Sequence, residues 1–168
     1  SGNHSGDYIQ CAMLLRFPEY AAFAGRALAE KVARYSPEII ASPAIGGIII
    51  GHEVARALNI PFIFCERQGG EMTLRRFPMP EGKRVVVIED VITTGVSSGE
   101  VGAVLAAGGA QWAGTGAIID RSEGRSSLPM APASLWEVAF PLWKPEECPL
   151  CARGAPLVKP GSRPPKEG

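Results

Sequence analysis

Two adjacent acids, Glu89 and Asp90, follow the apolar run Val85 to Ile88, and a hydroxyl-rich loop comes directly after them. The four β-branched residues predict a buried strand that ends at the acids. We expect a helix to begin at Ser97, with Glu100 completing a capping box. A helix N-terminus presents unpaired N–H groups and a partial positive charge, which suit a phosphate. Carboxylates beside such a cradle can hold sugar hydroxyls or a hydrated Mg²⁺, so the pattern predicts a site for a phosphorylated sugar.

Two further loops carry groups that suit an anionic ligand. Residues 42–47 follow an expected strand and open a helix, and the paired glycines Gly46 and Gly47 would let backbone N–H groups approach an anion. Arg121 follows another strand and offers a planar fork for a carboxylate. Each feature also has a purely structural explanation. The first two loops can be simple turns between a strand and a helix, and Arg121 can form a salt bridge at a strand end.

Alternating strands and helices must position these loops. Strands are expected at residues 38–42, 61–65, 83–89, 112–119 and 135–140, and helices at 18–35, 48–58 and 97–107. Asn59 should stop the second helix and Gly108-Gly109 should close the third. Residues 66–80 are expected to form a mobile loop or a hairpin. The proline-rich chain from Lys144 onward is expected to be largely irregular. The fold class is therefore α/β, with a mostly parallel central sheet flanked by helices. In such a sheet the three loops converge beyond the carboxyl ends of the strands.

The composition fits one packed domain. The chain has 168 residues, 46% of them apolar, and its 17 basic and 17 acidic residues cancel. Zero net charge argues against broad attraction to nucleic acid or to a membrane surface. We see no signal peptide and no apolar run near the length of a membrane span, so a soluble cytoplasmic protein is expected. Four cysteines are too few for a disulfide scaffold at this length.

The stretch from residue 85 to residue 97 resembles the phosphoribosyl-diphosphate (PRPP) binding motif of type I phosphoribosyltransferases. In that family two adjacent acids and a Thr-Thr-Gly-x-Ser loop follow a hydrophobic strand. Residues 1–9 look like the Ser-Gly-x-His-Ser-x-x-Tyr element of the orotate phosphoribosyltransferases. Residues 72–76, 148–151 and 158–162 match the same branch. The resemblance runs from Ser1 to about Ser162, almost the whole chain.

The resemblance implies a role for each matching residue. Glu89, Asp90 and Arg67 would be the catalytic residues: the acids would hold the ribose hydroxyls, and Arg67 would lie against the diphosphate. Loop 42–47 would be the diphosphate loop, where a non-proline cis or strained peptide often presents N–H groups. Mg²⁺ would bind through PRPP, with Asp90 as a candidate ligand. The PRPP-binding residues would be Ala44, Ile45, Gly46, Gly47, Glu89, Asp90, Val91, Thr93, Thr94, Gly95, Val96 and Ser97.

The resemblance also implies the second substrate and the reaction. Orotate would contact Thr93, Arg121, His4, Ser5 and Tyr8, and its reaction with PRPP would give orotidine 5′-monophosphate and diphosphate in pyrimidine nucleotide synthesis. The loop from residue 66 to residue 72 should close over the site, and in a homodimer it would reach the partner's site. Relatives carry helical elements before the position of Ser1, so we expect the N-terminal region to be truncated. We expect residues 1–143 to form the phosphoribosyltransferase domain and residues 144–168 a proline-rich tail that packs on it or extends from it.

Other functions remain open from the sequence alone. The same fold could use another nucleobase, or could bind PRPP as a regulator without catalysis. Cys148 and Cys151 have the spacing of zinc ligands, but a structural zinc site needs four ligands. Cys11, Cys65, His4 and His52 are the residues that could complete it, and none of them forms a second close pair.

Overall fold

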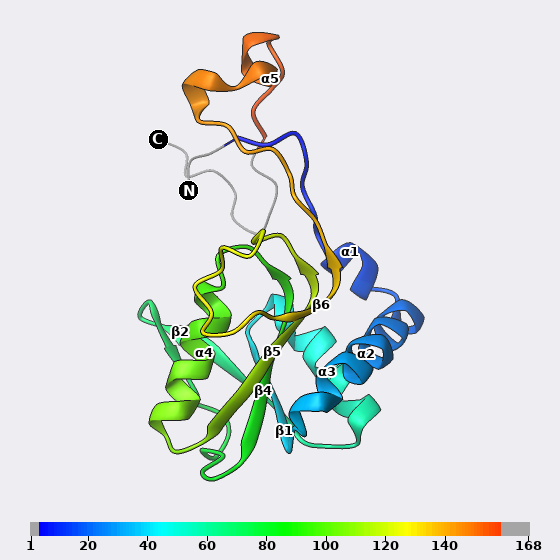
Figure 1. Ribbon diagram of the computed structural model, residues 1–168, viewed down its shortest axis with the longest axis vertical. Helices are drawn as coiled ribbons and strands as arrows, with labels where there is room; N and C mark the ends of the chain where they lie inside the picture. The colour runs from blue at the N-terminus through cyan, green and yellow to red at the C-terminus, as the bar shows by residue number, and fades with distance from the viewer. Residues whose placement is uncertain (1–3, 159–168) are drawn as a thin grey trace. The chain divides into compact units, whose positions relative to one another are not determined.

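A six-stranded sheet is the centre of the larger of two compact units, Cys11–Val138, in the computed structural model, which describes residues 4–158 (Figure 1). The strand order is β3-β2-β1-β4-β5-β6, and every neighbouring pair is parallel except β2 and β3. The strands are β1 Ile39–Pro43, β2 Phe62–Gln68, β3 Glu71–Thr73, β4 Arg84–Ile92, β5 Gln111–Asp120 and β6 Ala133–Glu137. The predicted fold class is confirmed, and the segment after residue 66 forms the hairpin that was one of its two predicted forms.

Helices cover both faces of this sheet. The helices of this unit are α1 Ala12–Leu15, α2 Pro18–Val32, the short η1 Ala33–Tyr35, α3 Gly46–Leu58 and α4 Val96–Ala107. Helices α2 and α3 pack on one face and α4 packs on the other (Figure 1). Pro18 stands at the start of α2, where its missing N–H costs nothing. Asn59 ends α3 in the left-handed conformation, with φ 54°, as predicted.

Strand β4 supplies apolar side chains to both halves of the core. Val85 and Val87 belong to the buried cluster that contains Val101 and Leu105 of α4. Ile88 lies on the other face, where it approaches Gly116 of β5 together with Val32 of α2. Successive side chains of a strand point to opposite faces. The alternation therefore directs residue 89 toward α4 and residue 90 toward α2 and α3.

Several predicted boundaries are wrong. Strands β2 and β4 continue to Gln68 and Ile92, three residues further than expected, and α3 begins at Gly46 and not at residue 48. Helix α4 begins at Val96 with Gly95 as its N-cap, and no side chain caps it, so Ser97 and Glu100 do not form a capping box. Gly95 has φ 80°, a left-handed conformation that glycine adopts without a Cβ clash, and this sets the start of the helix one residue earlier. The last strand covers residues 133–137 rather than 135–140, because it pairs with β5 over that range.

The smaller unit joins the two ends of the chain, and its described residues are 4–10 and 139–158. His4 and Trp143 form a two-way backbone bridge, with N···O distances of 2.8 and 2.9 Å. The segment predicted to be irregular contains the short helices η2 Pro145–Glu147 and α5 Pro149–Ala152, each with proline in its first turn. The domain boundary after residue 143 stays a prediction. Residues 1–3 and 159–168, which carry parts of the predicted motifs and tail, lie outside the described residues.

None of the helices within residues 4–158 has the length and apolar character that crossing a bilayer requires.

Candidate active site

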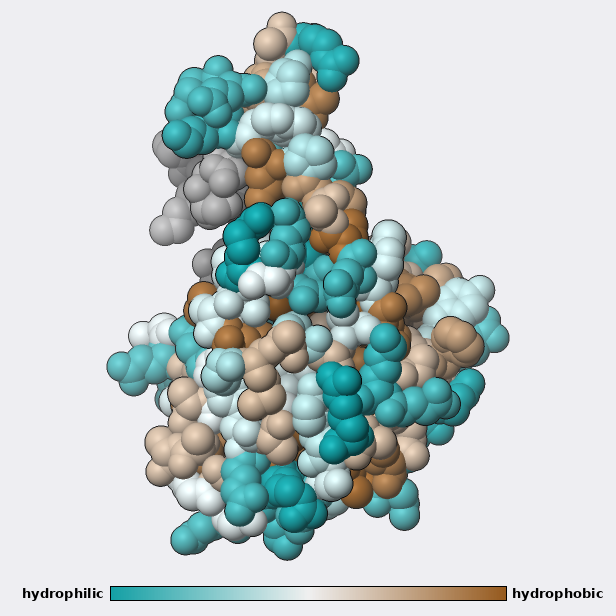
Figure 2. Space-filling view, in the orientation of Figure 1, coloured by the Kyte–Doolittle hydropathy of each residue, from teal (hydrophilic) through white to brown (hydrophobic). Residues whose placement is uncertain are grey.

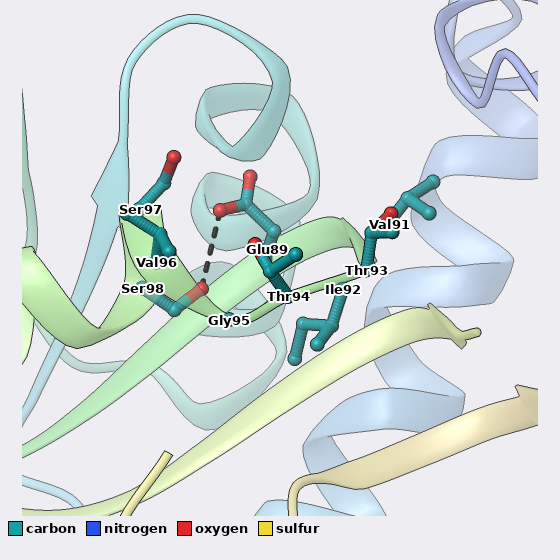
Figure 3. Close-up of a pocket in the computed structure, with 9 residues that line it drawn as sticks. All are labelled: Glu89, Val91, Ile92, Thr93, Thr94, Gly95, Val96, Ser97 and Ser98. Carbon is teal, nitrogen blue, oxygen red and sulfur yellow. Dashed lines mark hydrogen bonds between the residues drawn. The ribbon is translucent and has the colours of Figure 1, made fainter. Parts of the chain in front are cut away.

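A pocket of about 180 Å³ opens where β4 ends and α4 begins (Figure 3). One water molecule takes up about 30 Å³ in the liquid, so this space accommodates a larger polar group. Its lining residues are Glu89, Val91, Ile92, Thr93, Thr94, Gly95, Val96, Ser97 and Ser98. The structure thus brings together every residue from 89 to 97 that was predicted to bind PRPP, apart from Asp90, which does not line this pocket.

The start of α4 gives this pocket the character of an anion site. The first turn of a helix has backbone N–H groups without intrahelical partners. In α4 no side chain caps them, so they remain available to a bound group. The macrodipole adds a partial positive charge at the same end, and no acidic residue stands in the first turn to oppose an anion. The pocket is therefore suited to a phosphate.

Glu89 is a buried acid, with 9% of its surface exposed. The hydroxyl of Ser98 on α4 donates a hydrogen bond to its carboxylate, with an Oγ···Oε2 distance of 3.2 Å (Figure 3). Burial, and then the charge of Asp90, raise the pKa of Glu89 to about 8. At neutral pH this carboxyl is mostly protonated, and it can donate a hydrogen bond as well as accept one.

Asp90 lies on the opposite face of β4, against the loop before α3. A Cβ atom at Gly46 would lie 2.8 Å from its Oδ1, so a larger residue there would displace the carboxylate of this acid. A Cβ atom at Gly47 would come equally close to the carbonyl oxygen of Ile88. The N–H of Val91 donates to Asp90 Oδ1 at 2.9 Å. The structure thus places the predicted diphosphate loop directly beside Asp90.

The loop from Ala44 to Gly47 also has the backbone form that the resemblance implied. The peptide bond between Ala44 and Ile45 is cis. The N–H of Ala44 donates to the carbonyl of Cys65 at 2.7 Å, which ties the loop to the end of β2. Ile45 is 85% exposed, so its side chain does not anchor the loop in the core.

Arg121 stands one residue beyond β5, beside the last residue of β4. Its backbone N–H donates to the carbonyl of Ile92, a pocket residue, at 2.9 Å. The structure therefore brings the predicted carboxylate partner of orotate to the same sheet end as the phosphate pocket. Its contact with a ligand stays a prediction.

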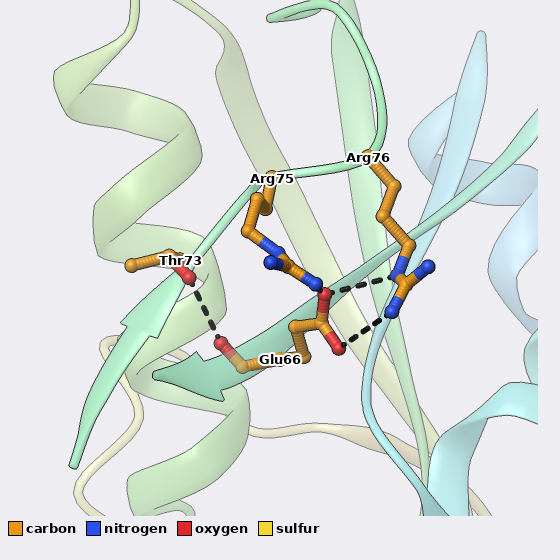
Figure 4. A network of polar contacts seen from close by, with 4 residues as sticks. All are labelled: Glu66, Thr73, Arg75 and Arg76. Carbon is orange, nitrogen blue, oxygen red and sulfur yellow. Dashed lines mark hydrogen bonds and ion pairs between the residues drawn. The ribbon is translucent and has the colours of Figure 1, made fainter. Parts of the chain in front are cut away.

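The guanidinium of Arg67 forms an ion pair with Glu100 of α4 and donates to the carbonyl of Gly70 at 2.7 Å. In the same hairpin, Arg75 and Arg76 both pair with Glu66, at 3.2 and 2.9 Å (Figure 4). The hydrogen bond from Arg76 is the main reason that the pKa of Glu66 is lowered. The cations of the hairpin are thus balanced by acids of the same chain, and an incoming diphosphate would have to exchange with those acids.

The predicted orotate residues near the N-terminus belong to the smaller unit. His4 Nδ1 lies 3.1 Å from Cys151 Sγ, and the Ser5 hydroxyl donates to the carbonyl of Pro141 at 3.0 Å. Tyr8 is 51% exposed. The roles of these three residues toward orotate stay predictions.

Two residues of the site were missed by sequence reasoning. Ser98 could have been found, because strand alternation directs Glu89 toward α4 and Ser98 lies in the first turn of that helix. Ser127 could not. Its N–H and its hydroxyl both donate to the carbonyl of Thr94, at 2.8 and 2.9 Å, from a connection between β5 and β6 that carries no recognisable motif.

The sequence and the fold are similar to those of known phosphoribosyltransferases. Residues 12–132 match the model of the phosphoribosyl transferase domain. The orotate phosphoribosyltransferase of Caldanaerobacter subterraneus is 44% identical over 97% of this chain and 86% of that relative. The orotate phosphoribosyltransferase of Thermotoga maritima is 45% identical over 97% and 88%.

Solved structures show the same fold. The crystal structure of orotate phosphoribosyltransferase from Aeropyrum pernix superposes with a TM-score of 0.69 at 24% identity, over 82% of this chain and 88% of that one. Adenine phosphoribosyltransferase from Thermoanaerobacter pseudethanolicus superposes with a TM-score of 0.68 at 16% identity, over 78% and 88%. With its phosphate pocket, its acid pair and relatives of this identity and coverage, the chain belongs to the phosphoribosyltransferase family, in its orotate phosphoribosyltransferase branch.

Proposed function

We propose that this chain transfers the phosphoribosyl group of PRPP to orotate, giving orotidine 5′-monophosphate and diphosphate for pyrimidine nucleotide synthesis. Relatives that match 97% of this chain carry the name of this enzyme. The single observation that supports the chemistry best is the pocket at the end of β4, where a buried acid stands beside an uncapped helix N-terminus.

The PRPP molecule would span the two faces of the β4 end. Its 5′-phosphate would bind the N–H groups at the start of α4 and the hydroxyls of Thr93, Thr94 and Ser97. The ribose hydroxyls would bind the carboxyl groups of Glu89 and Asp90. The diphosphate would lie against the loop from Ala44 to Gly47, which supplies backbone N–H groups beside Asp90.

The residues present suit Mg²⁺ bound together with PRPP. Mg²⁺ prefers oxygen ligands and is usually held by one or two carboxylates together with substrate phosphates. Asp90, which lies against the diphosphate loop, is the carboxylate best placed to hold it, and Glu89 is its neighbour. When bound, Mg²⁺ neutralises charge on the diphosphate. The residues of this chain supply the rest of the chemistry.

Catalysis would depend on position and charge. As diphosphate leaves, the anomeric carbon becomes cation-like, and the pocket would hold it in line with the attacking nitrogen of orotate. The N–H groups of loop 44–47 and the guanidinium of Arg67 would stabilise the leaving group. Residues 66–72 would close over the site and exclude water, which would otherwise hydrolyse the sugar cation.

The base site and the assembly complete the proposal. Arg121 would bind the carboxylate of orotate, with Thr93 and the N-terminal residues His4, Ser5 and Tyr8 near the ring.

The enzyme would act as a homodimer. In support, α1, α2 and the two-residue link between them expose large apolar side chains, at Met13, Leu14, Phe17, Tyr20 and Phe23, and part of this surface is seen over α2 in Figure 2. Exposed apolar patches of this kind mark interaction surfaces.

Calorimetry with PRPP and Mg²⁺ tests the central assignment. Asp90→Ala should abolish measurable PRPP binding while the fold survives, because Asp90 is only half-buried and lies at the sheet end. Glu81→Ala, at an exposed turn before β4, is the matched control and should bind normally. A folded Asp90→Ala protein with unchanged PRPP affinity would overturn the assignment.

Activity with orotate, compared with uracil, adenine and hypoxanthine, separates this function from transfer to another base and from regulation without catalysis.

A further inference from the structure

Three metal-ligating side chains meet in the smaller unit, and the proposed function uses only one of them. His4, Cys148 and Cys151 each offer one ligand atom, and these atoms all lie within 4.8 Å of one another. The His4 Nδ1 and Cys151 Sγ atoms are 3.1 Å apart. Both cysteines are free thiols. Within residues 4–158 this is the one group of three or more such side chains.

The spacing of these atoms suits a tetrahedral metal ion. Sulfur binds Zn²⁺ at about 2.3 Å and nitrogen at about 2.0 Å, so ligand atoms around the ion lie roughly 3.5 to 3.8 Å from one another. The His4–Cys151 separation of 3.1 Å is slightly below this range and the other separations are at most 4.8 Å, so small side-chain rotations would bring all three atoms onto one ion. Two thiolates and an imidazole are a ligand set that favours zinc over the hard cations.

The backbone holds the three residues in place from both ends of the chain. His4 is fixed by its two-way bridge to Trp143. Cys148 is the N-cap of α5, and Cys151 lies in the same short helix, so one turn of chain presents both thiols. Cys148 is 3% exposed whereas Cys151 is exposed, so an ion could enter from the Cys151 side.

We propose that His4, Cys148 and Cys151 bind one Zn²⁺ ion with solvent at the fourth position, which is the open coordination of a three-ligand site and not the closed set of four protein ligands. The ion would cross-link the N-terminal segment to the α5 turn, and would so join residue 4 to residues 148 and 151. This gives His4 a structural role, and it fixes the segment that carries Ser5 and Tyr8. The proposal is independent of the reaction, because it needs neither PRPP nor orotate.

Metal analysis of the untagged full chain tests the site. Protein expressed with added zinc should hold one zinc ion per chain after gel filtration, and the Co²⁺-substituted protein should show thiolate-to-cobalt charge-transfer absorption. His4→Ala, Cys148→Ser and Cys151→Ser should each lower zinc affinity by more than the roughly 10- to 100-fold that loss of an outer partner costs. His52→Ala, an exposed histidine of α3, and Cys65→Ala, a buried thiol of β2, are the matched controls and should keep the metal.

A second measurement keeps the test independent of folding defects in the variants. Trypsin cleavage at the exposed Arg153 should become faster when a chelator removes zinc from the wild-type chain. Cleavage of the Cys151→Ser variant should not respond to the chelator. A wild-type chain that binds no zinc, a Cys148–Cys151 disulfide found in its place, or unchanged zinc affinity in His4→Ala would each overturn the proposal.

Discussion

Glu89 and Asp90 are neighbours in sequence, but strand geometry gives them different surroundings. The side chain of Glu89 points toward α4, where it is buried and accepts a hydrogen bond from the Ser98 hydroxyl. The side chain of Asp90 points toward α3, and its carboxylate lies against Gly46. The first acid therefore has a pKa raised to about 8, whereas the second meets the loop from Ala44 to Gly47. The two carboxyl groups are suited to different parts of one ligand.

The raised pKa of Glu89 predicts a pH-dependent cost to stability. The unfolded chain releases this proton near the ordinary value of 4.5, whereas the folded protein keeps it up to about pH 8. Between these values the folded state binds more protons, so stability falls as pH rises. Glu89→Gln removes the charge and should be more stable than wild type by about 2 to 4 kcal/mol at neutral pH. Urea unfolding from about pH 4 to pH 9 measures this difference, and parallel profiles for the two proteins would contradict it.

Arg121 should determine the choice of base. Orotate differs from uracil by a carboxylate, which would be left unpaired in a desolvated site without this guanidinium. Arg121→Ala should lower kcat/KM for orotate by a factor equivalent to roughly 2–4 kcal/mol, with PRPP affinity nearly unchanged. Arg56→Ala, which loses only an exposed pair with Glu53 on α3, is the control. Normal orotate specificity in the Arg121 variant, measured by steady-state kinetics, would move the carboxylate contact elsewhere.

At the scale of elements, the site depends on how the loop after β4 enters α4. Gly95 turns the chain with φ 80° and leaves the helix uncapped. Ser127 holds the preceding carbonyl, that of Thr94, with two hydrogen bonds. The loop is therefore held from the β5–β6 connection, and its N–H groups stay available to a ligand.

Gly95→Ala and Gly99→Ala form a matched pair that tests whether the turn from β4 into α4 requires glycine at residue 95. A Cβ at Gly95 would lie 2.9 Å from Leu128 Cγ, and the left-handed backbone adds roughly 1–2 kcal/mol of strain. At Gly99, inside α4, the nearest atom is 3.9 Å away, and alanine should stabilise the helix by up to about 1 kcal/mol. We expect Gly95→Ala to lower both stability and phosphate affinity. Thermal unfolding and phosphate titration measure the two effects, and equal behaviour of the variants would show that the turn is not strained.

At the scale of the whole molecule, the proposed dimer offers two sources of the cation that would stabilise the leaving diphosphate, the same chain or its partner. Arg67 pairs with Glu100 of its own chain, and Arg75 and Arg76 pair with Glu66. These pairs are exposed, and surface ion pairs contribute only about 0–1 kcal/mol, so a diphosphate can displace them. In a two-fold dimer each hairpin would reach the other site.

Mixing two inactive variants tests this arrangement. If Arg67 acts across the dimer, an Asp90→Ala chain paired with an Arg67→Ala chain has one site with both residues intact. Activity should then return in the mixture, approaching a quarter of the wild-type rate per site when exchange is complete and pairing is random, since about half of the dimers are hybrids. Assays after verified subunit exchange measure this recovery. A mixture no more active than its parents would show that Arg67 acts within its own chain or does not contribute.

Local pattern was sufficient to locate five of the six strands of the described sheet, helices α2, α3 and α4, and the loop between β4 and α4. The β-branched run before Glu89 and the helical spacing of α2 depend on neighbours within a few residues, so they are readable from the sequence. The start of α4 was not, because the competing signals Gly95 and Ser97 lie two residues apart, and only the structure shows that the chain turns at Gly95, with φ 80°.

The sequence by itself therefore determined the family, the order of the elements and the position of the loop between β4 and α4, since each rests on short-range spacing. Only the tertiary structure decided that Asp90 meets Gly46, that Ser127 holds Thr94, and that His4 meets Cys151. Each of these contacts joins residues more than 30 positions apart. Such contacts depend on strand order and on the path of the connecting loops, which no local periodicity encodes.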